Sequence, residues 1–298
     1  MKKRVVGIGM AGVDFLGVVN HLSGPGSKME MSQFSIQTGG SVGTELVTSA
    51  SMGLETSFIG KISDDMFGDF IYKSLKQIGV DLRGLMIEKG KVSPFSYIAV
   101  EVSGRNRLLF HTRGNCSPLE INELDLSLID GGSALLLDGY QMKASIHAAE
   151  YSNKKGIPVI LDAAALTEGM GELVSLTNVL IASERFASET APMGELEDAL
   201  LELRRMGPET VVLTLGSEGS IGLTGNNVIR QSAYKTKDTV DTTGAGGIYR
   251  GAFVYGWLQK WDLEKCMRFA SVAAGLSCAS LGGLAGIPDK SRVMEIIG

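Results

Sequence analysis

The sequence is poor in cysteine and histidine. Its 298 residues include three cysteines, Cys116, Cys266 and Cys278, none in a CxxC spacing. This argues against a disulfide framework or a zinc site and favours buried thiols in a reducing compartment, so we expect a cytoplasmic protein. The three histidines stand in no metal-binding spacing such as HExxH.

Basic charge and long hydrophobic runs are also scarce. The 28 Lys and Arg residues are outnumbered by 33 Asp and Glu, and no basic stripe appears, so we expect no nucleic-acid partner. Residues 269–287 are uncharged, but they contain four glycines, which predicts a buried helix that ends near the glycines. Asp14 interrupts the apolar run after Lys2, which argues against a signal peptide, and we expect no membrane partner.

Glycine and apolar runs are plentiful instead. The chain holds 39 glycines and is 44% hydrophobic. Apolar runs at 134–138, 157–162, 178–182 and 210–216 alternate with helical patterns, which predicts a mostly parallel sheet covered by helices on both faces. Ligands of such sheets bind at the carboxyl ends of the strands. No repeat or linker divides the chain, so we expect one domain over 1–298.

The stretch Val240–Phe253 is the strongest candidate site in the sequence. A Thr pair runs into Gly244, Ala245, Gly246 and Gly247, and a helical apolar pattern follows. A glycine-rich turn that opens a helix presents unpaired N–H groups at the positive end of the helix dipole. Such a site suits an anion, and phosphate best of all.

This stretch resembles the second signature of the PfkB (ribokinase-like) carbohydrate kinases, through Asp241–Gly246 and Gly251–Phe253. The resemblance extends along the whole chain. It implies a ribokinase-like three-layer αβα sandwich with a central mostly parallel sheet and a small β-strand lid. It also implies transfer of the γ-phosphoryl of ATP to a sugar hydroxyl, with Mg²⁺ as cofactor. In that family an aspartate follows Gly-Ala-Gly and acts as the base, but this chain has Gly247 there.

The same resemblance assigns residues to the sugar side of the site. Gly244, Ala245 and Gly246 form the anion hole beside the missing base. Asp14, Gly39, Gly40 and Thr44 contact the sugar, and Thr44 stands where relatives have asparagine. A threonine hydroxyl donates and accepts hydrogen bonds through a single oxygen atom. The side-chain amide of asparagine has its acceptor oxygen and its donor nitrogen on separate atoms.

Further residues are assigned to the nucleotide and to cations. Ser183 and Glu184 match an Asn-Glu pair of the family, and Glu184 helps to hold Mg²⁺ indirectly. Asp241 and Thr243 match a monovalent-cation site that would take K⁺. The remaining positions would lie along the ATP, namely Thr214, Gly216, Gly219 and Ser277.

The lid is assigned to two inserted segments, at about 12–38 and 94–113. The second contains a predicted hairpin, with strands at 96–102 and 108–111 around Gly104, Arg105 and Asn106. Because relatives dimerise through this lid, the resemblance implies a homodimer.

Three functions follow from these patterns. The first is a sugar kinase impaired by Gly247, because general-base assistance contributes roughly 10²–10⁴ in rate. The second is an inactive pseudokinase that binds sugar or nucleotide as a sensor. The third comes from Gly7, Gly9 and Gly12, a formal G-x-G-x-x-G, which would indicate an NAD-binding oxidoreductase if a helix followed. The sugar itself stays open among nucleosides, fructose phosphates and keto-sugar acids.

Overall fold

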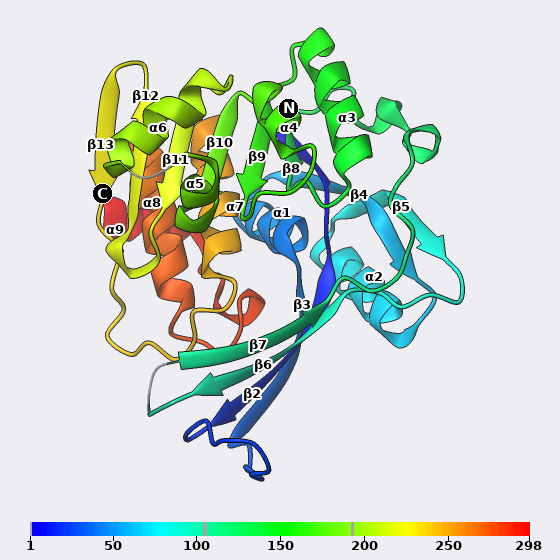
Figure 1. The fold of residues 1–298 in the computed structure, drawn as a ribbon, viewed down its shortest axis with the longest axis vertical. Helices are drawn as coiled ribbons and strands as arrows, with labels where there is room; N and C mark the ends of the chain where they lie inside the picture. The colour runs from blue at the N-terminus through cyan, green and yellow to red at the C-terminus, as the bar shows by residue number, and fades with distance from the viewer. Residues whose placement is uncertain (1, 104–105, 192–193) are drawn as a thin grey trace.

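A large central sheet organises the molecule (Figure 1). The computed structural model describes residues 2–103, 106–191 and 194–298. Within them, nine strands pair in the order β13-β12-β11-β10-β9-β8-β1-β4-β5. In chain order these strands are β1 (Arg4–Ile8), β4 (Glu55–Ser63), β5 (Asp81–Glu88), β8 (Ala134–Leu137), β9 (Val159–Ala163), β10 (Val179–Ser183), β11 (Thr210–Thr214), β12 (Ser220–Thr224) and β13 (Asn227–Gln231).

Pairing from β11 through to β5 is parallel, and only β12 and β13 run antiparallel. The apolar runs explain the central strands, because a parallel strand covered on both faces is apolar along its whole length. Every residue of β8 and β9 is buried. The predicted alternating architecture is therefore confirmed.

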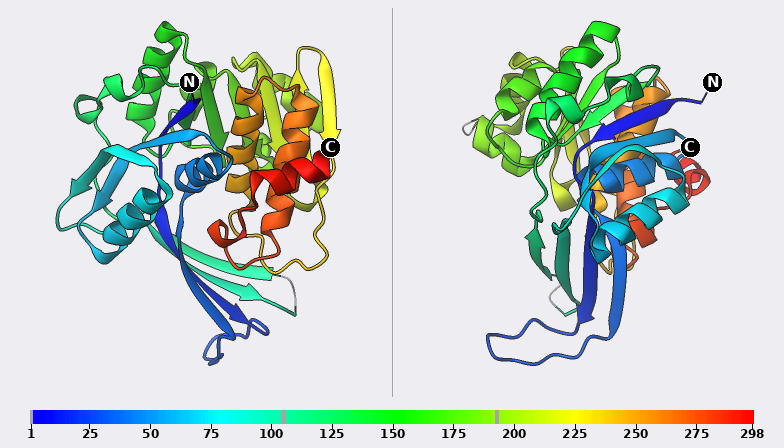
Figure 2. Two further views of the ribbon diagram at one scale, coloured as in Figure 1. Left: turned by 180° about the vertical axis from the view of Figure 1, so that it is seen from behind. Right: turned by 90° about the vertical axis from the view of Figure 1, so that its right-hand side faces the viewer.

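Helices cover both faces of this sheet (Figure 2). Buried side chains gather in two main clusters, one on each face. One face carries α1 (Ser41–Ser51), α2 (Met66–Ile78), α7 (Ala245–Leu258), α8 (Leu263–Ser277) and α9 (Lys290–Ile297), and the other carries α3 (Met142–Lys155), α4 (Met170–Ser175), α5 (Glu184–Thr190) and α6 (Leu196–Arg205). As the glycines at 282, 283 and 286 predict, α8 ends before them.

Of the helices in the described ranges, none combines the length and the apolar character needed to cross a membrane.

A second sheet of four strands projects from one edge of the body (Figures 1 and 2). Its order is β3-β2-β6-β7. The strands are β2 (Gly12–Val19), β3 (Gln33–Gly39), β6 (Phe95–Glu101) and β7 (Asn106–Thr112). The predicted hairpin is present as the antiparallel pair β6–β7, although Gly104 and Arg105 lie outside the described residues. We call this sheet the lid.

The glycines near the N-terminus do not form a dinucleotide turn. β1 leads directly into the lid strand β2, so the helix that a Rossmann fingerprint requires is missing from this place. Side-chain packing accounts for the glycines instead. A Cβ on Gly7 would lie 2.6 Å from Val42, and one on Gly9 would lie 2.4 Å from the carboxylate of Asp138. The condition for an NAD site at these glycines, a helix directly after β1, is therefore not met.

Candidate active site

The glycine-rich turn before α7 has the geometry of an anion site. Gly244 caps the helix with φ of 79°, and a Cβ there would lie 2.6 Å from the backbone of Gly283. Only glycine fits both demands. In the described chain the N–H groups of Gly246 and Gly247 donate to no protein acceptor, so they remain free at the positive end of the helix dipole.

Asp241 holds this turn in place. Its Oδ1 accepts hydrogen bonds from the backbone N–H and the hydroxyl of Thr243, at 2.9 and 2.8 Å. Its Oδ2 accepts from the N–H of Gly282 at 2.9 Å. The carboxylate thus ties the start of the turn to the loop after α8, and both residues predicted for a monovalent cation belong to this arrangement.

Thr44 occupies the space beside Gly247. A Cβ built on Gly247 would lie 2.9 Å from the Cγ2 of Thr44 and 3.0 Å from its Cβ. Thr44 is only 6% exposed on α1, and its β-branched side chain has little freedom to move aside. Positions 44 and 247 therefore face each other, and the methyl group of Thr44 fills the space that a side chain at position 247 would enter.

Three residues predicted to contact the sugar, Asp14, Gly39 and Gly40, lie close together. Asp14 projects from β2 next to Gly39, where a Cβ would lie 2.1 Å from the carboxylate. Gly40 caps α1 with φ of 84° against the backbone of Met10. Burial raises the pKa of Asp14, a hydrogen bond with Ser96 lowers it, and the charge of Asp241 raises it further. Asp14, Gly39 and Gly40 are thus brought together at the base of the lid.

Two lid side chains contact the loops around the anion turn. The amide of Gln37 on β3 donates to the carbonyl of Leu281 at 2.7 Å and accepts from the N–H of Leu284 at 3.1 Å. Arg107 on β7 donates to the hydroxyl of Thr242 at 3.0 Å. These contacts hold the lid against the loops that carry the turn.

Sequence reasoning missed Asp138 as a site residue. It follows β8, where its Oδ2 accepts from the N–H of Met10 at 2.9 Å and its Oδ1 from the N–H of Tyr140 at 2.8 Å. Ser41 at the start of α1 donates to it as well. Burial raises the pKa of Asp138, against the lowering effect of these hydrogen bonds. Its position directly after an apolar strand was the signal that could have identified it.

A buried charged cluster was missed too. Arg250 on α7 and Asp162 on β9 are 8% and 3% exposed, and the Nε and Oδ1 atoms lie 2.8 Å apart. Neither atom makes a well-aligned hydrogen bond, so charge rather than hydrogen-bond geometry holds the pair. Glu45 on α1 is completely buried beside them. Burial, and then the charge of Asp162, raise the pKa of Glu45 well above its ordinary value.

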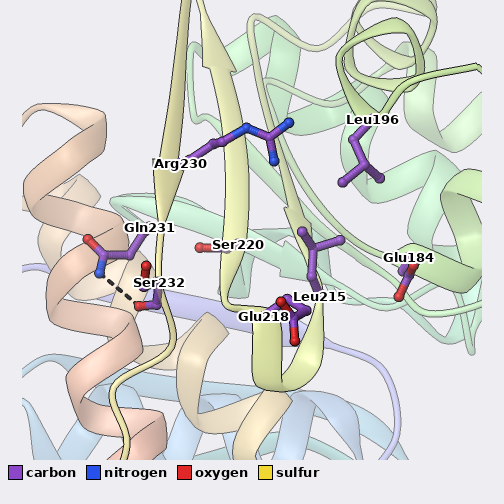
Figure 3. Close-up of a pocket in the computed structure, with 8 residues that line it drawn as sticks. All are labelled: Glu184, Leu196, Leu215, Glu218, Ser220, Arg230, Gln231 and Ser232. Carbon is purple, nitrogen blue, oxygen red and sulfur yellow. Dashed lines mark hydrogen bonds between the residues drawn. The ribbon is translucent and has the colours of Figure 1, made fainter.

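The part of the molecule that carries the residues predicted to contact the nucleotide is more open. A cavity of about 320 Å³ is bordered by Glu184, Glu218 and Arg230 (Figure 3). Glu184 is exposed at the start of α5. Arg230 pairs with Glu197 across the rim at 2.5 Å. An acid with a free side chain at the edge of this cavity is compatible with an indirect Mg²⁺ contact.

The other predicted nucleotide residues serve local structure in the described chain. Ser183 caps α5 by accepting from Phe186 and donates to Ala164. Thr214 donates to the carbonyl of Ala182 at 3.3 Å, and the hydroxyl of Ser277 donates within its own helix. Gly216 and Gly219 take positive φ values of 57° and 98° in the turn between β11 and β12. None of these five lines the cavity that Glu184 borders.

Comparison with known proteins places this chain in a family. A family model described as pfkB family carbohydrate kinase matches residues 2–290. A ribokinase of Arabidopsis thaliana is 25% identical over 98% of this chain and 80% of its own length. A 5-dehydro-2-deoxygluconokinase of Bacillus subtilis is 26% identical, covering 98% and 95%. The structure of Arabidopsis ribokinase complexed with ribose and ATP aligns over 100% and 99% of the two chains with a TM-score of 0.84 and 24% identity. With the αβα fold, the anion turn and the lid, this match shows that the chain belongs to the pfkB family of carbohydrate kinases.

Proposed function

We propose that this chain binds ATP, Mg²⁺ and a sugar, and that it transfers the γ-phosphoryl slowly because it lacks the base. One observation carries the proposal. The free N–H groups of Gly246 and Gly247 and the carboxyl of Asp14 are present, but position 247 has no side chain and Thr44 fills the adjacent space. The binding groups remain while the proton acceptor is gone.

The remaining residues supply positioning and charge stabilisation. The N–H groups of the turn would donate to the oxygens of the transferred phosphoryl group, where negative charge develops. Asp14 would accept hydrogen bonds from sugar hydroxyls. Because burial raises the pKa of Asp14, sugar affinity should fall with decreasing pH sooner than for an ordinary aspartate. Positioning and charge carry most of phosphoryl transfer, so activity is reduced rather than abolished.

The cofactors follow from the family and from the open side of the site. Mg²⁺ keeps several waters and binds through one or two carboxylates plus substrate phosphates, so Glu184 alone is a sufficient protein contribution. When bound, the ion would neutralise charge on the phosphates of ATP. Asp241 and Thr243 remain the proposed neighbours of a K⁺ ion, in the role of shaping the loop.

A second candidate is a binding protein that senses a sugar or nucleotide. The contact between Thr44 and Gly247 favours it, because the space of the missing base is filled by protein rather than left open. Such packing suits a site that binds a sugar or nucleotide without transferring a phosphoryl group. Turnover separates the two candidates, since the sensor binds without measurable transfer.

A homodimer through the lid is part of the proposal. The lid's outer surface exposes large apolar side chains, including Phe34, Tyr97 and Phe110 at 56%, 53% and 62%. A second copy of the chain has the same apolar lid surface. In a symmetric dimer, the lid of each copy would cover the apolar lid surface of the other. Mass measurement in solution should give twice the chain mass, and Phe110→Ser should shift it toward the monomer; a monomeric wild type contradicts this part.

The proposal is tested by measuring binding and turnover together. ATP–Mg²⁺ and a sugar panel that includes ribose and 5-dehydro-2-deoxygluconate are titrated by calorimetry, and ADP formation is followed with each sugar. We expect binding of both ligands with slow turnover. Asp14→Asn should weaken sugar binding at least tenfold and leave ATP binding intact, whereas the exposed Asp69→Asn is the control. A chain that binds neither ATP nor any sugar contradicts the proposal.

A further inference from the structure

One row of side chains crosses the face of the lid that carries Asp14. In the strand pairing, Asp14 of β2 is opposite Ser96 of β6, and Ser96 is opposite His111 of β7. Gln37 of β3 is opposite Asp14 on its other side. Directly paired residues point to the same face of a sheet. His111 therefore lies on the same face as Asp14, two strands and about 10 Å away.

Arg113, which follows β7 directly, brings a positive charge to the end of this strand. Its guanidinium lies over the ring of Tyr140, with Cζ 5.6 Å from the ring centroid. The hydroxyl of Tyr140 donates to the carbonyl of Arg113 at 2.7 Å and so holds the ring against this segment. Arg113 is exposed, and its guanidinium makes no salt bridge or hydrogen bond with another described residue. Within the described chain, this permanent positive charge has no anionic partner.

Tyr140 connects this cation to the residues on which the sugar is expected to bind. Its backbone N–H donates to Oδ1 of Asp138 at 2.8 Å, and Oδ2 of Asp138 accepts from Ser41. Ser41 begins α1 next to the glycines that lie against the carboxylate of Asp14. A chain of direct contacts thus runs from Asp14 to the guanidinium of Arg113.

The two ends of this chain of contacts suit different groups of one ligand. The carboxylate oxygens of Asp14 and Asp138 accept hydrogen bonds from sugar hydroxyls. A guanidinium binds a carboxylate through two parallel hydrogen bonds and opposite charge, and the imidazole of His111 can donate a further bond. A phosphate monoester carries a charge of about −1.5 to −2 near pH 7, so a single arginine matches it less well than it matches a carboxylate.

We propose that the sugar substrate carries a carboxylate, which Arg113 binds with the help of His111 while Asp14 and Asp138 bind its hydroxyl groups. This inference deepens the proposed function and rests on it, because it names the substrate class as a sugar acid. Arg113 and His111 are then the residues that select an acid over a neutral sugar.

Calorimetry on the whole chain with matched probes tests the substrate class. D-gluconate and D-glucitol share a six-carbon chain and differ at one end, where the first has a carboxylate and the second a hydroxymethyl group. The other probes are 5-dehydro-2-deoxygluconate, ribose and ribose 5-phosphate. At least one acid should bind at least tenfold more tightly than every neutral or phosphorylated probe.

The outcomes separate this inference from the proposed function. The inference is overturned if neither acid binds, or if a neutral or phosphorylated sugar binds as tightly as the acids. Binding of ribose and ATP in that case leaves the proposed function standing, whereas a chain that binds no sugar and no ATP contradicts both.

Substitutions of Arg113 locate the interaction. Arg113→Gln removes the charge at an exposed position and should reduce acid affinity at least tenfold, with no change in ribose or ATP affinity. Arg113→Glu should reverse the preference, so that glucitol binds more tightly than gluconate. Arg292→Gln on the exposed surface of α9 is the matched control. An acid preference that survives Arg113→Gln, or an equal loss of ATP binding, contradicts the role of Arg113.

His111 is tested by His111→Phe, which keeps a ring and removes both nitrogen atoms. Loss of one hydrogen bond should weaken acid binding about two- to fivefold. Unchanged acid affinity would show that His111 takes no part in binding the carboxylate.

Discussion

The two sides of the candidate site differ in how tightly they are packed. On the phosphoryl side, Thr44, Gly247 and Arg250 lie in the contact between α1 and α7, where an added Cβ meets an atom at 2.9 Å. Around the residues predicted for the nucleotide, Glu184 is exposed and a Cβ on Gly216 meets nothing within 4 Å. A larger side chain on the crowded side fits only if the neighbouring side chain becomes smaller. On the open side a larger side chain needs no such change. Positions 44 and 247, which face each other, both lie on the crowded side.

The largest stability effect should come from breaking the buried pair on the crowded side. Arg250→Met alone leaves Asp162 buried without its cation, and such breaks cost about 3–5 kcal/mol. The double variant Arg250→Met with Asp162→Asn should recover most of that loss. Urea unfolding of both proteins checks this. Equal stability of the single and double variants would show that the pair carries no buried charge.

A matched pair of glycine changes compares the two sides directly. Gly244→Ala adds a positive-φ penalty and a 2.6 Å approach to the backbone of Gly283, whereas Gly216→Ala adds only the φ penalty. Left-handed backbone costs a non-glycine residue about 1–2 kcal/mol. We expect Gly216→Ala to lose about 1 kcal/mol, and Gly244→Ala to lose clearly more. Equal losses in chemical denaturation would mean that the crowded side can relax.

The smallest effect concerns the pH dependence of stability. Because burial raises the pKa of Glu45 in the folded protein, folding favours the protonated form. The contribution of Glu45 to the free energy of unfolding is then least favourable at pH values above its pKa in the folded protein. It becomes more favourable as the pH falls toward the pKa of glutamate in the unfolded chain, about 4.3. Glu45→Gln should raise the melting temperature at pH 8, by roughly 2 °C or more, and change it less at pH 5.

Thermal scans of both proteins at the two pH values test this prediction. Asp69→Asn provides a matched loss of one exposed carboxylate. If Glu45→Gln changes the melting temperature equally at both pH values, the pKa of Glu45 is not raised in the folded protein.

The fold could be predicted from the sequence because its signals are local. Apolar runs such as Ala134–Leu137 indicate strands covered on both faces, and glycines 244–247 mark a turn before a helix. The lid segments came from the resemblance to the family. The formal G-x-G-x-x-G misled because its glycines make room for Val42 and Asp138 rather than for a ligand.

The interior of the site could not be predicted, because its contacts join segments far apart in the chain. Nothing local indicates that Thr44 faces Gly247, or that Arg250 pairs with Asp162 beside Glu45. Likewise, Ser183 matched a functional position in sequence, whereas in the structure its hydroxyl caps α5.

The most direct measurement is a cycle of four proteins compared for ATP-dependent phosphorylation of whichever sugar binds: the unmodified chain, Gly247→Asp, Thr44→Ser, and both changes together. Thr44→Ser removes the methyl group that lies 2.9 Å from a Cβ on position 247 and keeps the hydroxyl. We predict a gain of about 10²–10⁴ for the double variant, a smaller gain for Gly247→Asp alone, and none for Thr44→Ser. If ATP and sugar bind to the double variant but turnover does not rise, the missing base is not what limits this protein. If Gly247→Asp alone gains as much as the double variant, Thr44 does not crowd the base position.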